Sequence, residues 1–187
     1  MANRGNIIDP WYITGFTDGE GCFSLFLNSE NRKRKNGTIS EYTYWITVFR
    51  VQLREDDFEV LQKFKEYFEC GSLGKYKSTK VNQAGSATFH VKSRIDLINH
   101  IVPHFDQFQL QAKKSISYNL WREAVQILRN SDLRRKNKFS QQDLTTEENN
   151  RLLQIKTTMA NSQSPGHKYI ALNSVERKSR GKKVIFL

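Results

Sequence analysis

The chain has 187 residues, and its 30 Lys and Arg against 19 Asp and Glu give a formal net charge of +11. A chain of this length can bury a hydrophobic core, and such a positive excess favours a polyanionic partner, above all nucleic acid, over a neutral small-molecule substrate. We find no apolar run approaching the ~20 residues of a membrane-spanning helix and no secretory signal at the N-terminus, so we expect no membrane association. The two widely spaced cysteines suit buried thiols in a reducing compartment.

The first elements expected along the chain are one helix and two strands. Asp9-Pro10 is typical of a helix start, with Asp as the N-cap and Pro in the first helical position, and the helix is expected to run to about Glu20. Alternating side chains predict a strand over 22–28, with Phe23, Leu25 and Leu27 facing the core. A charged turn at 28–37 and a second strand at 42–53, rich in β-branched and aromatic residues, follow.

The unit of two strands and a helix then recurs. Asp56-Asp57 is expected to cap a helix that ends at Gly71, with an apolar stripe made of Phe58, Leu61, Phe64, Tyr67 and Phe68. A hairpin is expected from the segments 72–78 and 87–92, followed by a helix from Arg94 to about Ile101 that Pro103 would interrupt. This order predicts an αββαββα arrangement.

Two further helices are expected after the second unit. One covers 111–129, with Ile116, Leu120, Trp121, Ala124 and Leu128 on its apolar side, and the other runs from Thr145 to about Met159. Thr145 and Glu148 form the sequence signature of a capping box at the start of the second. We assign 1–160 to a single domain and 161–187 to a basic C-terminal extension, which is either a phosphate-binding arm or a solvated tail.

The segment 13–21, ITGFTDGEG, is the most informative part of the sequence. Gly15 and Gly19 lie four residues apart on one face of the expected helix, and each costs about 1 kcal/mol of helix stability relative to alanine. Close approach of a second helix would explain that cost. Asp18 and Glu20 place two acidic groups where the helix meets the first strand.

This segment, extended to ITGFTDGEGCF, resembles the signature of the LAGLIDADG homing endonucleases. The resemblance implies an α+β domain, αββαββα, whose signature helices pack together at a two-fold axis above a saddle-shaped antiparallel sheet that lies along the DNA major groove. We expect extra C-terminal helices here. We find no second signature over 23–187, and chains with one signature form homodimers. The expected dimer interface consists of Trp11, Tyr12, Gly15, Phe16 and Gly19.

The resemblance also implies the catalytic residues. Glu20 would bind a divalent cation, Mg²⁺ or Mn²⁺, with Gly19 beside it in the metal site, whereas Asp18 would be a structural hydrogen-bonding residue. The family places polar or basic residues near the end of the second strand, here Gln52 or Arg54. It places others before the helix after the second repeat, here Gln111 or Lys113. We take Glu20, Gln52 and Lys113 as the candidate catalytic set.

DNA recognition would use the sheet face opposite the core. Arg50 is the best candidate for reading a base, because its guanidinium can bond to the O6 and N7 of guanine. The other residues expected on this face are Ser24, Phe26, Asn28, Tyr44, Val48, Thr88, His90 and Lys92. The expected phosphate contacts, with an ordinary solvated charge as the alternative for each lysine, are Arg32, Lys33, Arg34, Lys35, Lys75, Lys77 and Lys80.

The sequence therefore predicts a homodimeric, divalent-metal-dependent endonuclease that cuts double-stranded DNA at a long, near-palindromic site. The alternative is a non-cleaving nucleic-acid binder on the same fold, either an intron RNA maturase or a DNA-binding regulator. A third possibility is one half of a two-domain enzyme. Abundant Lys and Asn suit an intron-encoded protein of an organelle, mitochondrion or chloroplast, with the bacterial cytoplasm as the alternative.

Overall fold

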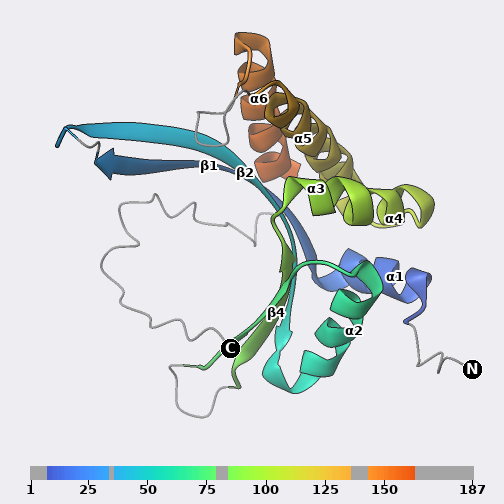
Figure 1. Ribbon diagram of the computed structural model, residues 1–187. Helices are drawn as coiled ribbons and strands as arrows, with labels where there is room; N and C mark the ends of the chain where they lie inside the picture. Colours follow the sequence, from blue (N-terminus) through green and yellow to red (C-terminus); the bar gives the residue numbers. More distant parts are fainter. Residues whose placement is uncertain (1–7, 34–35, 79–83, 136–142, 163–187) are drawn as a thin grey trace, which may run out of the picture.

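The computed structural model describes residues 8–33, 36–78, 84–135 and 143–162. Its elements follow the expected αββαββα order, with extra helices at the C-terminal end (Figure 1). In chain order they are α1 (Pro10–Glu20), β1 (Gly21–Lys33), β2 (Ile39–Arg54), the short 3-10 turn η1 (Glu55–Asp57), α2 (Phe58–Phe68), β3 (Ser72–Tyr76), β4 (Ser86–Val91), α3 (Arg94–Asp96), the π-helical turn η2 (Leu97–Ile101), α4 (Val102–Gln107), α5 (Lys114–Arg134) and α6 (Thr146–Ser162). The expected α+β fold class is confirmed.

The four strands form one antiparallel sheet in the order β1-β2-β4-β3. The sheet is curved, and the helices lie on its convex side, so that the opposite, concave face carries no helix of the described ranges (Figure 1). Within those ranges no helix is long and apolar enough to cross a membrane. No helix of the described residues therefore competes with a ligand for the concave face of the sheet.

The core fills the space between the sheet and the helices. Inward-facing residues of the strands, among them Phe49 and Phe89, are fully buried against Phe64 of α2, Phe105 of α4 and Trp121 of α5. The alternation that predicted the inward face of the strands is confirmed for most of their length, because Phe23, Leu25, Phe49 and Val51 are all buried. Leu27, which was expected in the core, is 42% exposed, since β1 there extends beyond the helices.

Two of the predicted helix starts are confirmed at the level of hydrogen bonds. Asp9 Oδ1 accepts from the amides of Trp11, at 2.8 Å, and Tyr12, at 3.2 Å, which fixes the first turn of α1. At α6 the amide of Thr145 donates to Glu148 and the amide of Glu148 donates to Thr145 Oγ1, the reciprocal pair of a capping box. Asp57 precedes α2 but accepts no capping hydrogen bond from it.

The first two strands are longer than the sequence pattern predicted. Residues 28–33, expected in a turn, continue β1 to Lys33, and β2 begins already at Ile39. Cross-strand contacts sustain this extension despite its polar sequence: Asn28 donates to Tyr44 Oη at 2.8 Å, and the Arg32 guanidinium lies 4.1 Å from the Tyr42 ring centre. Pairs of this kind stabilise a ladder where strand propensity alone is weak.

Pro103 does not end the helix that begins at Arg94, contrary to the prediction. The chain stays helical to Gln107, because the preceding turn η2 is a widened π turn in which the Val102 amide donates to the Leu97 carbonyl. A widened turn relieves the contact between a proline ring and the carbonyl four residues earlier. The next helix, α5, spans Lys114–Arg134 rather than 111–129, and Ile116, expected in its apolar stripe, is exposed.

Candidate functional site

The three glycines of the segment 13–21 have different structural roles. A Cβ atom at Gly21 would lie 2.4 Å from Thr17 Cγ2 and 2.8 Å from the Thr17 carbonyl oxygen, so the passage from α1 into β1 requires glycine there. A Cβ atom at Gly15 or Gly19 would meet no atom within 4 Å. Nothing in the described chain therefore explains Gly15 and Gly19, and both lie on the exposed side of α1.

The exposed side of α1 also carries two large aromatic residues. Trp11 is 54% exposed and Tyr12 is 49% exposed, whereas Ile13, Thr14 and Thr17 on the opposite side are buried. Phe16, expected in the dimer interface, is only half-buried, and its ring packs edge-on against Phe64 of the core with centroids 5.8 Å apart. The exposed surface of α1 therefore consists of aromatic residues at one end, backbone at two glycines, and Glu20 at the other end.

Asp18 has a structural role, as the sequence suggested. Its Oδ2 atom accepts from the amides of Gln111, at 2.8 Å, and Ala112, at 3.3 Å. These amides precede the first turn of α5, so the Asp18 carboxylate ties the segment before α5 to α1. Its other oxygen, Oδ1, is buried without a hydrogen-bond partner among the described residues.

Lys114 is the site residue that the sequence did not identify. Its Nζ atom donates to the carbonyl oxygens of Thr17, at 2.8 Å, and Gly19, at 3.0 Å, and so lies at the C-terminal end of α1 next to Glu20. Burial lowers the pKa of Lys114, while Cys22, Asp18 and Glu20 act in the opposite direction. A cation in this position also complements the negative end of the helix dipole.

The two lysines that precede and begin α5 are placed differently. The side chain of Lys113, the candidate from the sequence, is exposed and makes no hydrogen bond or ion pair with any described residue, whereas the neighbouring Lys114 side chain turns toward α1. The sequence shows two adjacent lysines, Lys113 and Lys114. Which of the two points toward α1 depends on the residue at which α5 begins. Gln111, the other candidate, bonds its side chain to the Gln109 carbonyl at 2.8 Å.

Gln52 lies at the end of β2 nearest to Glu20. The register pairs Val51 with Gly21, the residue directly after Glu20, and Gln52 follows Val51 on the exposed, concave face. Arg54, the alternative, is paired instead with Asp56 through hydrogen bonds of 3.2 and 2.9 Å. The sheet thus brings Gln52, rather than Arg54, to the Glu20 end of α1.

The oxygen atoms around Glu20 suit a hard divalent cation, but one chain supplies few of them. Glu20 is exposed and has no hydrogen-bond or ion-pair partner in the described ranges, and the Gly19 carbonyl oxygen keeps a second lone pair beside the bond from Lys114. Mg²⁺ is commonly held by one or two carboxylates together with water and substrate phosphate. The described residues contain no group of three His, Cys, Asp or Glu that could hold a metal ion. The oxygen atoms of Glu20 and Gly19 therefore fit a cation that a second carboxylate would also bind.

The concave face carries most of the expected recognition residues. Tyr44, Arg50 and His90 are half-buried there, and the register pairs Arg50 with His90 and with Cys22. Val48 and Thr88 have the expected outward orientation, but neighbouring atoms cover them and they are only 8% and 4% exposed. The remaining members of the set lie on β1 or just after β4, and they are half-buried or exposed: Ser24, Phe26, Asn28 and Lys92.

The expected phosphate contacts lie around this face. Lys75 Nζ lies 4.0 Å from the Phe58 ring centre, and Arg32 is paired with Glu30. Lys33 is exposed at the end of β1, whereas Lys77 is exposed just after β3. Three further predicted contacts and most of the basic extension lie outside the described residues: Arg34, Lys35, Lys80 and 163–187.

The chain matches a known family model and several curated relatives. A family model described as LAGLIDADG endonuclease matches residues 13–125. A Podospora anserina protein, described as an uncharacterized 50.9 kDa protein in ND4 intron 1, is 32% identical over 127 residues, 67% of this chain and 25% of that protein. A probable intron-encoded DNA endonuclease 1 of Mycosarcoma maydis is 30% identical over 132 residues, 70% of this chain and 42% of that protein. The chain thus spans less than half the length of these curated relatives.

Solved structures show the same fold. The homing endonuclease I-TnaI superposes with a TM-score of 0.63 at 24% identity, over 82% of this chain and 89% of that one. I-SmaMI, bound to uncleaved DNA in the presence of calcium ions, superposes with a TM-score of 0.63 at 22% identity, over 85% of this chain and 47% of that one. The match of the family model, which includes the signature helix and both strand pairs, shows that the chain belongs to the LAGLIDADG endonuclease family.

Proposed function

We propose that the chain is a site-specific endonuclease that hydrolyses double-stranded DNA at a near-palindromic site. The observation that carries this proposal is the exposed Glu20 carboxylate at the end of α1, beside an ammonium group fixed by the Thr17 and Gly19 carbonyls. The concave face, which carries no helix of the described residues, and the net charge of +11 support DNA as the substrate. The names of the relatives, probable intron-encoded endonucleases, agree.

The active form is a homodimer in which α1 packs against α1 of a second copy. Gly15 and Gly19 support this arrangement, because they leave one side of the helix backbone accessible and a Cβ atom at either position would meet no atom of the described chain within 4 Å. Trp11 and Tyr12 supply apolar surface at the other end of the same side. The two-fold axis brings the two Glu20 carboxylates together, and each copy then places one sheet along one half of the DNA site.

Glu20 is the proposed ligand of Mg²⁺ or Mn²⁺, with the Gly19 carbonyl beside it. Such a cation lowers the pKa of bound water and stabilises the attacking and leaving oxygens of a phosphodiester. In the proposed dimer the two Glu20 carboxylates would repel each other, and a cation held by them would reduce that repulsion. Lys114 adds a fixed positive charge where negative charge develops on the phosphate. Gln52 positions water from the end of β2, and the exposed Lys113 contacts phosphate.

We infer that the protein is intron-encoded and acts in an organelle. Relatives from Schizosaccharomyces pombe and Neurospora crassa carry names that describe them as intron-encoded endonucleases, which supports this origin. The bacterial cytoplasm remains the alternative location.

The test is cleavage of a randomised palindromic duplex library in the presence of Mg²⁺, with the cut ends read by sequencing. Defined ends that disappear with Glu20→Gln, and with Ca²⁺ in place of Mg²⁺, are the expected result. Glu20→Gln removes a charge without a change of shape, and Glu20 has no partner in the described ranges, so the variant should fold normally. Tight duplex binding without cutting in any divalent metal would instead identify a non-cleaving regulator or maturase.

A further inference from the structure

The first two strands continue beyond the helices as an arm, which consists of residues 26–33 of β1 and 39–44 of β2 (Figure 1). None of these residues is buried, whereas Trp45, the next residue of β2, is 1% exposed. Cross-strand contacts such as the bond from Asn28 to Tyr44 Oη, at 2.8 Å, join the two strands of the arm. The direction of the arm is therefore set where it leaves the core, at Trp45.

Trp45 is held from two sides. Its Nε1 atom donates to Asn149 Oδ1 of α6 at 2.9 Å, and its carbonyl oxygen accepts from Arg94 Nη1 at 3.4 Å. A buried indole N–H without a hydrogen-bond partner is unfavourable, so the first bond ties β2 to α6 at this point. The two bonds fix the base of the arm relative to the helices.

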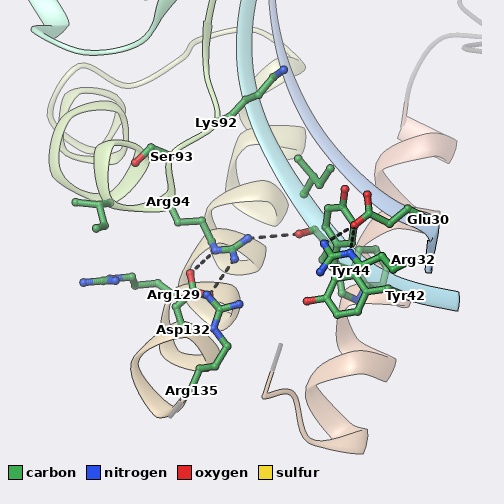
Figure 2. A pocket seen from close by; sticks show the side chains of 13 residues that line it. Glu30, Arg32, Tyr42, Tyr44, Lys92, Ser93, Arg94, Arg129, Asp132 and Arg135 are labelled. Carbon is green, nitrogen blue, oxygen red and sulfur yellow. Dashed lines mark hydrogen bonds and ion pairs between the residues drawn. The ribbon is translucent and has the colours of Figure 1, made fainter. Parts of the chain in front are cut away.

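The Arg94 side chain takes the place that a neighbouring strand would occupy. The β2–β4 ladder ends at the pair Phe49–Val91, so β4 does not reach Trp45. Figure 2 shows Arg94 between Asp132 of α5 and β2. Its guanidinium bonds to both carboxylate oxygens of Asp132, with Nη2 and Oδ1 2.9 Å apart, and the two side chains are only 19% and 16% exposed. A two-point bond of this kind orients the guanidinium, so that Nη1 reaches the Trp45 carbonyl.

A pocket separates the arm from α5 next to this anchor. It has a volume of about 760 Å³, and its walls include Tyr42 and Tyr44 of the arm and Arg129 and Asp132 of α5. In Figure 2 the two tyrosines lie on one side of the pocket and the two α5 residues on the other. The arm therefore has room to change its tilt if the bonds at Trp45 are lost.

The arm extends away from Glu20. β1 begins at Gly21, directly after Glu20, and its 13 residues at about 3.3 Å each span about 40 Å, the length of about 12 base pairs of DNA. With Glu20 near the two-fold axis of the proposed dimer, residues 26–33 would lie over the outer part of each half of the DNA site. A small change of tilt at Trp45 would displace these residues far more than those close to Glu20.

We propose that Asn149 and Arg94 are positioning residues that determine specificity at the outer base pairs of the DNA site. Both act through Trp45, and neither needs to touch DNA for this effect. Hydrogen bonds to base edges discriminate between bases only when the side chains that make them are held in place. This inference rests on the proposed function as a site-specific DNA endonuclease and assigns part of its specificity to α6 and to the turn after β4.

The experiment selects bound duplexes from a randomised library with the full-length protein, with Ca²⁺ in place of Mg²⁺. Sequencing gives the preference for the favoured base at each position from the centre of the site. For Asn149→Ala and Arg94→Lys we expect this preference to fall about tenfold at the outer positions and to change less than about twofold at the inner ones. Arg94→Lys keeps the charge but cannot bond to Asp132 at two points and to Trp45 at once.

Two further variants serve as controls. Asn149→Asp keeps the acceptor for Trp45 Nε1 and should retain the wild-type profile. Arg151→Gln removes the bonds of 2.6 and 2.8 Å from Arg151 of α6 to Glu123 of α5 but leaves both bonds of Trp45 in place, so its profile should also match the wild type. Melting temperatures compare the folding of all variants.

Three results would overturn the inference while leaving the proposed function intact. The first is an unchanged profile for Asn149→Ala or Arg94→Lys. The second is an equal loss of preference at inner and outer positions, which would indicate a general loss of structure. The third is a wild type that selects bases at the inner positions alone, because the arm would then read no sequence. Failure of the wild type to select any duplex sequence would instead refute the proposed function, and this inference with it.

Discussion

Lys114 donates to the Gly19 carbonyl oxygen at 3.0 Å, and this bond joins the first residue of α5 to the last turn of α1. The two residues are 95 positions apart in the sequence. The bond holds an ammonium group next to the Glu20 carboxylate, at the end of the helix whose exposed side carries Gly15 and Gly19. The position of this charge therefore depends on how α5 docks against α1.

Replacing Lys114 by Met should abolish or greatly reduce DNA cleavage while DNA affinity stays close to that of the wild type. Loss of one fixed charge at the reacting phosphate costs about 10²–10³ in rate by analogy with other preorganised donors. Lys113→Met is the matched control, since it removes the same charge one residue earlier from a side chain that is exposed. Single-turnover cleavage at saturating protein distinguishes the two variants. A larger loss from Lys113→Met would show that the candidate chosen from the sequence was the right one.

Gly15→Ala should leave the stability of the folded chain unchanged or raise it, but should weaken the proposed dimer. At Gly15 the added methyl group meets no atom within 4 Å, and helix propensity favours alanine by about 1 kcal/mol, so the chain itself should not be destabilised. The dimer should weaken, because the methyl group separates two closely packed helices. Analytical ultracentrifugation of Gly15→Ala against the wild type measures this effect. An unchanged dimer would mean that α1 is not the interface.

Gly21→Ala is the contrasting variant. Its Cβ would lie 2.4 Å from Thr17 Cγ2 and 2.8 Å from the Thr17 carbonyl oxygen, so α1 or β1 must shift. We expect a loss of about 1–3 kcal/mol in the free energy of unfolding, as for other overpacked sites. Urea unfolding measures it. Equal stabilities for Gly15→Ala and Gly21→Ala would contradict the conclusion that only Gly21 is required by contacts within the chain.

Local patterns in the sequence were sufficient for the order of the elements and for the inward faces of the strands. The Asp9 cap, the Thr145–Glu148 capping box and the alternation around Phe23 and Phe49 each depend on neighbours within a few residues. The errors arise where a distant partner decides the outcome. Residues 28–33 are a strand because β2 pairs with them, and Pro103 lies within a helical segment because η2 widens before it.

The candidate site was predictable to the same extent. Glu20 and Asp18 lie within one signature, and the hydrogen bonds from Gln111 and Ala112 confirm the structural role expected for Asp18. Lys114 could not be chosen over Lys113 without the start of α5, and α5 begins where it does partly because Asp18 holds the preceding amides.

DNA affinity should increase as the pH falls toward about 6, through His90. Burial, with the charges of Lys92 and Arg50, lowers the pKa of His90 in the protein without DNA. Bound phosphates neutralise those cations and raise the pKa of His90, so the complex takes up a proton. Binding measured at two pH values should show this increase for the wild type and a smaller one for His90→Gln. An identical pH dependence in both proteins would exclude His90 as the responsible group.

The stability of the fold should decrease on mild acidification because of His104. Burial lowers the pKa of His104 to about 4, and the side chain is 5% exposed. Thr14 Oγ1 donates to the Phe108 carbonyl at 2.9 Å, so it accepts from His104 Nε2 at 3.2 Å, which leaves Nδ1 to accept from Tyr67 Oη at 3.0 Å. This chain of bonds joins α1, α2 and α4 and uses the neutral imidazole.

The sign of the effect follows from the two pKa values. An unfolded chain protonates His104 near pH 6.5, whereas the folded chain keeps it neutral down to about pH 4, so protons favour unfolding within that interval. The free energy of unfolding should fall by about 2 kcal/mol between about pH 7.5 and about pH 5. His104→Leu should be less stable at neutral pH but should show a flatter dependence, while His100→Gln keeps the wild-type slope. Urea unfolding at one protein concentration gives these slopes, and an equally steep slope for His104→Leu would place the acid sensitivity elsewhere.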